Sequence, residues 1–80
     1  MLNCGDGLFW KKDPRPYYVK MYVVLHVDYN NSPYSTVECL AVMCDGSIQL
    51  RKENYDVFLE EIKTSEKRPA ISNWHFVRTS

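Results

Sequence analysis

An apolar or aromatic residue at every second position between Tyr17 and Tyr29 constrains this chain more than any other feature. Every odd position in the stretch is apolar or aromatic, whereas the even positions mix aromatic, charged and apolar side chains. Because successive side chains of a β-strand point to opposite faces of a sheet, this period predicts one long, half-buried strand. Lys20 and His26 interrupt the apolar character, so the stretch does not qualify as a membrane-spanning segment.

Two further strands are predicted over residues 35–44 and 47–52, separated by an Asp-Gly pair. Asp-Gly favours a two-residue hairpin loop, because a type I′ turn needs positive φ at both central positions. Such a loop pairs Cys44 with Ser47 and thereby sets which side chains share a face. The face predicted to point to the core, together with the odd residues of the first strand, consists of Val37, Cys39, Ala41, Met43, Ile48 and Leu50.

From Asn54 the apolar period changes to three and four residues, which predicts an amphipathic helix. The apolar stripe of this helix is formed by Tyr55, Phe58, Leu59 and Ile62. Asn54 suits the N-cap position, and Pro69 ends the helix after a pair of cations. Residues 70–79 contain aromatic and β-branched side chains and predict a closing strand.

These elements predict an α+β fold, in which a three- to four-stranded antiparallel sheet carries one helix packed on one face. Residues 1–16 hold two of the three glycines and two of the four prolines, which predicts an irregular N-terminal arm. The predicted order is therefore arm-β-β-β-α-β. Residues 17–80 form a single domain, because a chain of 80 residues is too short to bury two cores.

One short helix covers one face of such a sheet, so the opposite face is expected to be open. The predicted open face combines apolar and aromatic side chains with a charged rim, which is the composition of a protein-binding patch. The candidate protein-binding residues, including one from the arm, are Trp10, Tyr18, Lys20, Tyr22, Val24, His26, Leu40, Val42 and Arg51. Two alternatives remain open, namely that the arm folds over this face or that a second copy of the chain covers it.

A local run of basic and aromatic residues gives a second hypothesis, in which the chain is a small nucleic-acid-binding module. Aromatic side chains beside cations suit single strands, and such a run lies between Trp10 and Lys20. Its candidate contacts are Lys11, Lys12, Arg15, Tyr17, Tyr18 and Lys20. A formal net charge of zero speaks against a protein whose main task is to neutralise phosphates.

Catalysis and metal binding are not expected. Cys39 and Cys44 differ by an odd number, so their side chains leave opposite faces of a regular strand and do not form a close ligand pair. No nucleophile elbow, metalloprotease motif or phosphate-binding glycine loop is present. We therefore predict no catalytic residues, no metal and no cofactor. Three cysteines cannot all pair within the chain, and no secretory signal or membrane-spanning run is found, which predicts a cytoplasmic protein.

The leading hypothesis is a small non-enzymatic interaction protein that binds, and inhibits or modulates, another protein or complex. Viral accessory proteins of phages and mobile elements that inhibit a host enzyme are similarly small and neutral, but this analogy rests on no shared residues. The nucleic-acid-binding module is one alternative. A self-associating structural subunit, such as a homodimer, is the other.

Overall fold

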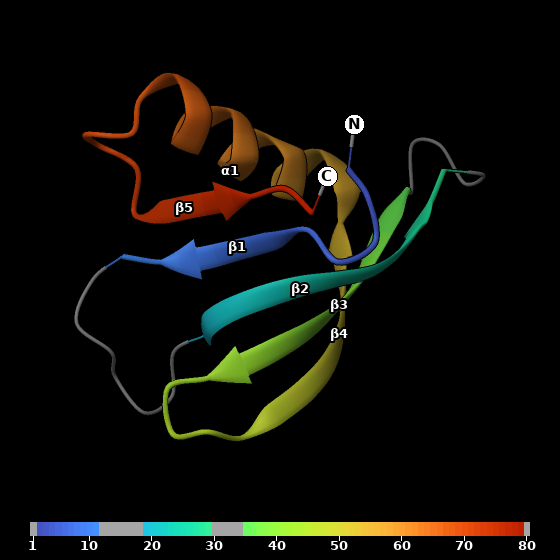
Figure 1. Cartoon of the computed structure of the whole chain (residues 1–80). Coiled ribbons are helices and arrows are strands. Elements are labelled where there is room, and N and C mark those ends of the chain that lie inside the picture. Colours follow the sequence, from blue (N-terminus) through green and yellow to red (C-terminus); the bar gives the residue numbers. More distant parts are fainter. Residues whose placement is uncertain (1, 12–18, 30–34, 80) are drawn as a thin grey trace.

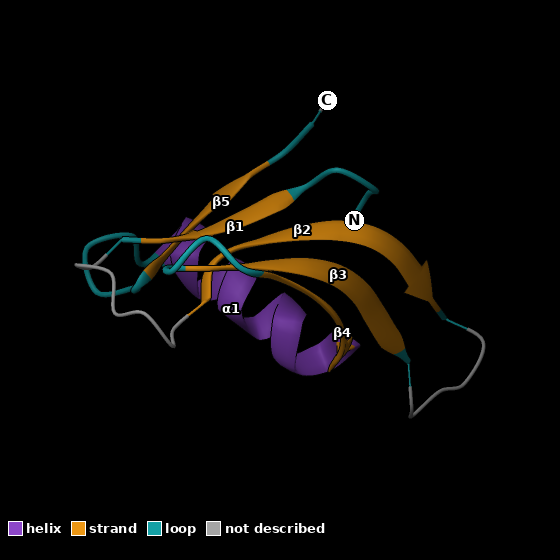
Figure 2. Ribbon diagram, turned by 90° about the horizontal axis from the view of Figure 1, so that it is seen from below, coloured by secondary structure: helices purple, strands orange, loops and turns teal. Residues whose placement is uncertain are grey.

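The computed structural model describes residues 2–11, 19–29 and 35–79 (Figure 1). Within these residues the elements are β1 (Gly7–Trp10), β2 (Val19–Asp28), β3 (Thr36–Met43), β4 (Ile48–Asn54), α1 (Tyr55–Lys67) and β5 (Trp74–Val77). The strands form one antiparallel sheet in the order β4-β3-β2-β1-β5. The helix α1 lies on one face of this sheet (Figures 1 and 2). The α+β class with one helix on an antiparallel sheet is confirmed.

The number and order of strands differ from the prediction. Residues 7–10, predicted as part of an irregular arm, form β1, which pairs with β2 on one side and with β5 on the other. The described order is therefore β-β-β-β-α-β, with five strands rather than three or four. A four-residue strand is too short to show a period in the sequence, and its place in the sheet depends on partners that are distant along the chain.

Strand β2 contains two irregularities that change which side chains point toward the helix. Its register with β3 shifts between Val19 and Met21 and again between Val24 and His26, so each step places one extra residue on β2. Each extra residue reverses the alternation of the strand, as expected for a β-bulge. The residues of β2 opposite the buried positions of β3 are consequently Val19, Tyr22, Val24 and Val27.

The turn between β3 and β4 has three residues rather than the predicted two. The N–H of Gly46 donates to the carbonyl of Met43 at 3.0 Å, and the N–H of Met43 donates to the carbonyl of Ser47 at 2.8 Å. Gly46 has φ of +91°, whereas Asp45 is not among the residues with positive φ. This geometry matches a type I turn followed by a glycine bulge, not a type I′ turn. It shifts the pairing by one residue, so that Leu50 lies opposite Leu40.

The core lies between α1 and the sheet. Asn54 begins the helix as predicted, because its side chain accepts hydrogen bonds from the N–H groups of Asp56 and Val57. The ring of Tyr22 meets that of Phe58 edge-on, with centroids 5.8 Å apart. The main buried cluster consists of Leu2, Leu8, Val24, Val37, Cys39, Phe58 and Ile62.

A buried carboxylate joins the two ends of the described chain. The carboxylate of Asp6 accepts hydrogen bonds from the N–H of Asn3 at 2.8 Å, and from the N–H and hydroxyl of Thr79 at 3.0 and 3.1 Å. Burial alone would raise the pKa of Asp6, but these hydrogen bonds and the nearby Arg78 outweigh it and hold the pKa below its ordinary value. Asp6 therefore fixes β1 and β5 beside each other.

Candidate interaction surface

The sheet face opposite α1 carries two continuous rows of mostly apolar side chains, each running across all the strands. Directly opposed residues of antiparallel strands share a face, so the strand register defines these rows. The first row, from β5 to β4, is Val77, Gly7, Val23, Leu40 and Leu50. The second row is His75, Phe9, Met21, Val42 and Ile48. We call these ten residues the open face.

The apolar side chains of the open face are solvent-accessible to very different degrees. Leu50 is 70% exposed and Ile48 is 61% exposed, while Val77 and Phe9 are 42% and 37% exposed. The apolar residues of the central strands β2 and β3 are half-buried. Accessibility therefore rises toward the edges of the sheet, and the apolar rows are continuous between them. A contiguous apolar surface of this kind is unusual on a monomeric protein and is typical of an interaction site.

The ring of Phe9 lies against the backbone of Gly7. A Cβ atom at Gly7 would lie 2.9 Å from the ring of Phe9, so the ring occupies the space that a side chain at position 7 would need. An aromatic ring that covers a glycine in a strand compensates for the missing side chain. The absence of a side chain at Gly7 thus leaves room for the ring of Phe9 over this position of the open face.

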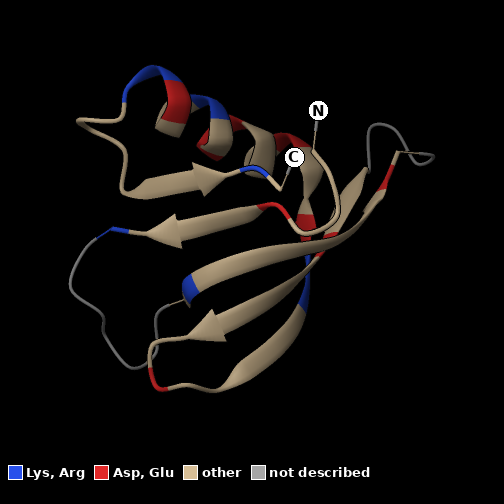
Figure 3. Ribbon diagram, viewed as in Figure 1, with Lys and Arg blue, Asp and Glu red and all other residues tan. Residues whose placement is uncertain are grey.

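A group of three polar or charged residues borders the open face at one end. His26 on β2 lies opposite Glu38 on β3, and Glu38 lies opposite Lys52 on β4. The carboxylate of Glu38 is 3.9 Å from the ammonium of Lys52. Other charges gather along the helix (Figure 3). The open face is therefore an apolar surface with a polar border, as in many protein interfaces.

The structure places three of the predicted protein-binding residues on or beside this surface. Leu40 and Val42 lie in the two rows, and His26 lies in the bordering group. All three were assigned to the uncovered side of the sheet by alternation along β2 and β3.

Three other predicted residues lie on the helix-covered side, so their assignment to the uncovered face was wrong. Val24 is fully buried, and Tyr22 packs against Phe58 and against Trp74, whose ring centroid is 5.6 Å away. The bulges of β2 account for both residues, because they reverse the alternation. Arg51 lies opposite buried Cys39, because the three-residue turn shifts β4 by one position.

The remaining predicted residues lie in or near the segment between β1 and β2. Trp10 is half-buried and packs edge-on against Trp74, with ring centroids 4.9 Å apart. Lys20 is exposed at the first bulge of β2. Lys11 is also exposed and donates from its ammonium to the carbonyl of Pro69 at 2.7 Å. The candidates that fall outside the described residues are Lys12, Arg15, Tyr17 and Tyr18.

Sequence reasoning missed most of the exposed part of the open face. Ile48 and Leu50 were assigned to the core, and Phe9 was assigned to the arm. Their exposure follows from a turn geometry and a strand pairing that the local sequence does not specify. Gly46 was the available signal for the three-residue turn, because a three-residue loop that ends in a glycine bulge is the next most common hairpin connection after the two-residue loop.

Two observations concern nucleophilic and metal chemistry in the described residues. Burial, reinforced by the nearby carboxylate of Glu53, raises the pKa of Cys39 to about 11. This thiol is therefore protonated at neutral pH and is a poor nucleophile. Within the described ranges, no three His, Cys, Asp or Glu side chains are grouped closely enough to share a metal ion.

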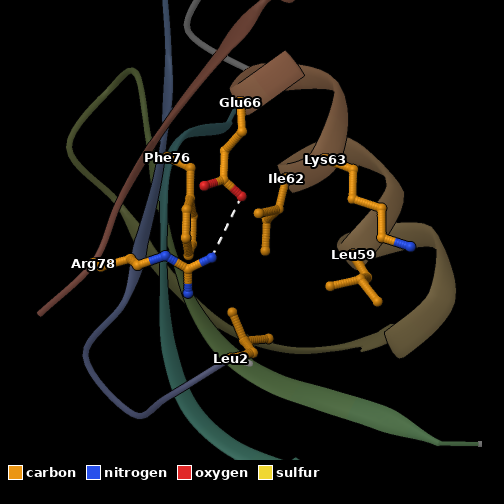
Figure 4. A pocket seen from close by; sticks show the side chains of 7 residues that line it. All are labelled: Leu2, Leu59, Ile62, Lys63, Glu66, Phe76 and Arg78. Atoms are coloured by element: carbon orange, nitrogen blue, oxygen red, sulfur yellow. Dashed lines mark hydrogen bonds and ion pairs between the residues drawn. The ribbon is translucent and has the colours of Figure 1, made fainter. Parts of the chain in front are cut away.

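A small hollow lies between α1 and β5, on the helix side of the sheet (Figure 4). It has a volume of about 160 Å³ and is lined by Leu2, Leu59, Ile62, Lys63, Glu66, Phe76 and Arg78. The guanidinium of Arg78 lies 4.8 Å from the ring centre of Phe76 and 3.4 Å from the carboxylate of Glu66. Small-molecule sites usually measure about 300–1,000 Å³, so this hollow is small by comparison.

Among the residues that the structure describes, no helix is both long enough and apolar enough to cross a membrane. The search for relatives covered family models, curated proteins and solved structures, and none of them matches this chain.

Proposed function

We propose that this protein is a small, non-enzymatic interaction protein that binds and modulates another protein through the open face. The observation that carries the proposal is the pair of apolar rows, which runs across the whole sheet and which α1 leaves uncovered. Leu50 and Ile48 remain mostly exposed in the chain alone. Burial of apolar surface is the main favourable term in protein association, so a partner that covers these rows gains the most there.

The curvature of the sheet defines the shape that a partner needs. Strands β2 and β3 bend around α1, so that the helix lies on the inner side of the curve and the open face on the outer side (Figure 2). An outward-curved apolar surface is best complemented by a concave one. The expected partner therefore presents an apolar groove, with polar groups positioned to meet His26, Glu38 and Lys52 at one end.

An affinity capture experiment tests this proposal. Tagged protein is used to retain partners from a lysate of its source, and the retained proteins are identified by mass spectrometry. The double variant Met21→Lys/Val42→Asp changes two directly opposed residues at the centre of the open face. Both side chains are half-buried, so circular dichroism must first show that the variant remains folded.

Val57→Lys is the matched control. Val57 is an exposed apolar residue of α1, away from the open face. The proposal expects the double variant to lose the retained proteins and Val57→Lys to keep them. Equal retention by the two folded variants would contradict it.

The nucleic-acid hypothesis rests on a segment that is mostly outside the described residues. Its two described cations, Lys11 and Lys20, lie at opposite ends of that segment. A titration with single-stranded oligonucleotides at low salt separates the two hypotheses, because phosphate contacts weaken steeply as salt rises.

A further inference from the structure

The outer edge of β4 has its backbone donors and acceptors arranged for another strand. Two hydrogen bonds establish which residues of β4 bond to β3: the N–H of Met43 donates to Ser47, and the N–H of Tyr55 donates to Ser35. In antiparallel pairing, bonded and non-bonded pairs alternate along the ladder. Odd-numbered residues of β4 therefore bond to β3. The N–H and carbonyl groups of Ile48, Leu50 and Lys52 point outward.

This edge lacks several of the usual protections against strand addition. Protected edges are very short, bulged, interrupted by proline, or lined with charged side chains. On β4 the charged side chains are confined to residues 51–53, and residues 48–50 are uncharged. Strand β4 has seven residues, contains no proline, and pairs with β3 without a register shift. Within the described part of the chain, its only strand neighbour is β3.

We propose that the outer edge of β4 pairs antiparallel with β4 of a second copy of this chain, around a two-fold axis at Leu50. The sheets of the two copies then join into one. This inference goes beyond the proposed function, because the interface is formed by the backbone edge and not by the open face.

The charges along β4 select this position of the axis. An axis at Arg51 or Lys52 would place that cation directly opposite its own copy, and like charges in that position are destabilising. An axis at Gln49 would leave only residues 48–50 in mutual register, because β4 begins at Ile48.

With the axis at Leu50, all the opposed pairs are compatible. Leu50 meets the partner's Leu50, and Ile48 meets the aliphatic stem of the partner's Lys52. Gln49 meets the partner's Arg51, and these two side chain types already pair within one strand, where the guanidinium donates to Gln49 at 2.8 and 3.1 Å. The pairing would add about six backbone hydrogen bonds at residues 48, 50 and 52 of the two chains.

The same axis places the two open faces side by side on one surface. A two-fold axis perpendicular to the sheet keeps both helices on one side and both open faces on the other. The exposed side chains of Ile48 and Leu50 would then lie in the middle of a continuous apolar surface instead of at its margin.

Substitution of Leu50 by residues of opposite charge tests the proposal on the purified full chain. Leu50 is the residue that faces itself across the proposed axis, so Leu50→Glu and Leu50→Lys each place like charges in contact. Sedimentation equilibrium between 5 and 500 μM should show a dimer for the unmodified chain. Each variant alone should dissociate at least tenfold more readily, and an equimolar mixture of the two should restore the dimer.

Ile48→Glu is the matched control, because it introduces the same charge on the same strand at a similarly exposed position. It faces the partner's Lys52 in the proposed register, so its dimer should be as stable as that of the unmodified chain or more stable. Circular dichroism confirms that each variant is folded, which the exposure of both side chains favours.

Three results would overturn the proposal. The first is an unmodified chain that remains a monomer throughout the concentration range. The second is a dimer that Leu50→Glu and Leu50→Lys leave unchanged. The third is a dimer that both weaken but that their mixture does not restore, which would indicate apolar packing of the open faces rather than this strand register.

Discussion

Neighbouring residues of β3 lie in opposite environments. Val37, Cys39 and Ala41 point toward α1 and are fully buried, whereas Leu40 and Val42 point away from it and remain half-buried. Both sets are apolar, so hydrophobicity alone does not distinguish the covered face from the open face. A sheet with one apolar side and one solvated side normally alternates apolar and polar residues. The departure from that alternation on the open face is the feature on which the proposed binding role rests.

The two faces also differ in how they are filled. On the covered face, aromatic rings of the sheet and the helix pack edge-on, as Tyr22 and Phe58 do. On the open face, the strands supply side chains in flat rows and Phe9 lies over Gly7. Substitutions on the covered face should therefore alter stability, while those on the open face should alter binding. The following predictions test that difference.

The largest effect is expected for a charge placed at Val24. Val24→Asp buries a carboxylate without partners and should cost more than about 4 kcal/mol, enough to unfold a small domain. Val23→Asp, one residue earlier, places the same group on the open face and should cost less than about 1.5 kcal/mol. Urea titration followed by circular dichroism measures both. If Val23→Asp is the more destabilising variant, the positions of the bulges in β2 are wrong.

Truncation of the helix side chain that contacts Tyr22 should give the next largest effect. Phe58→Ala removes a buried ring and should lower the free energy of unfolding by about 3–5 kcal/mol. Val57→Ala, its exposed neighbour on the same helix, should change it by no more than about 0.5 kcal/mol. Thermal and urea unfolding provide the comparison. Similar losses for the two variants would show that α1 does not cover the sheet with the face containing Phe58.

The sequence was sufficient to predict the helix and the covered face of β3. Asn54 caps the helix in the predicted way, and Val37, Cys39, Ala41 and Met43 are buried as their alternation indicated. These features depend on local periods and on one capping side chain. Such information is contained in a few consecutive residues.

The open face could be predicted only in part, because its composition depends on register. Leu40 and Val42 were identified correctly from β3. Val24 was misplaced because a bulge adds one residue to β2, and Leu50 was misplaced because the turn has three residues. A shift of one residue moves every later side chain to the other face. Phe9 was missed because β1 forms through pairing with distant strands, not through a local pattern.

A smaller effect is expected at the carboxylate that holds β1 and β5 together. Asp6→Asn keeps one acceptor oxygen but loses the other, so the N–H of Asn3 is left without its partner. The free energy of unfolding should fall by about 1–3 kcal/mol at pH 7. The open face should lose order first at β1 and β5, which amide hydrogen exchange at Phe9 and His75 would detect.

The pH dependence of this contribution has a defined sign. The pKa of Asp6 is lowered in the folded chain, so its stabilising effect is present above the unfolded value of about 4 and is lost as the pH falls below it. The difference in stability between the unmodified chain and Asp6→Asn should therefore shrink as the pH falls below about 4. A difference that stays constant over this range would show that the ionised carboxylate makes no contribution.

The smallest effect is expected at the turn that determines which face Leu50 occupies. Gly46 has a positive φ and nothing lies within 4 Å of a Cβ atom at that position, so a substitution there is penalised by backbone conformation alone. Gly46→Ala should cost about 1 kcal/mol, and Gly46→Asn should cost less, because asparagine tolerates this conformation better. Urea unfolding measures both variants, and a contact between the Hα protons of Leu40 and Leu50 in nuclear magnetic resonance spectra reports the register directly. If Ala and Asn are equally tolerated and the Hα proton of Leu50 contacts that of Ala41 instead, the turn has two residues. Leu50 would then point toward the helix, and the apolar rows of the open face would end at β3.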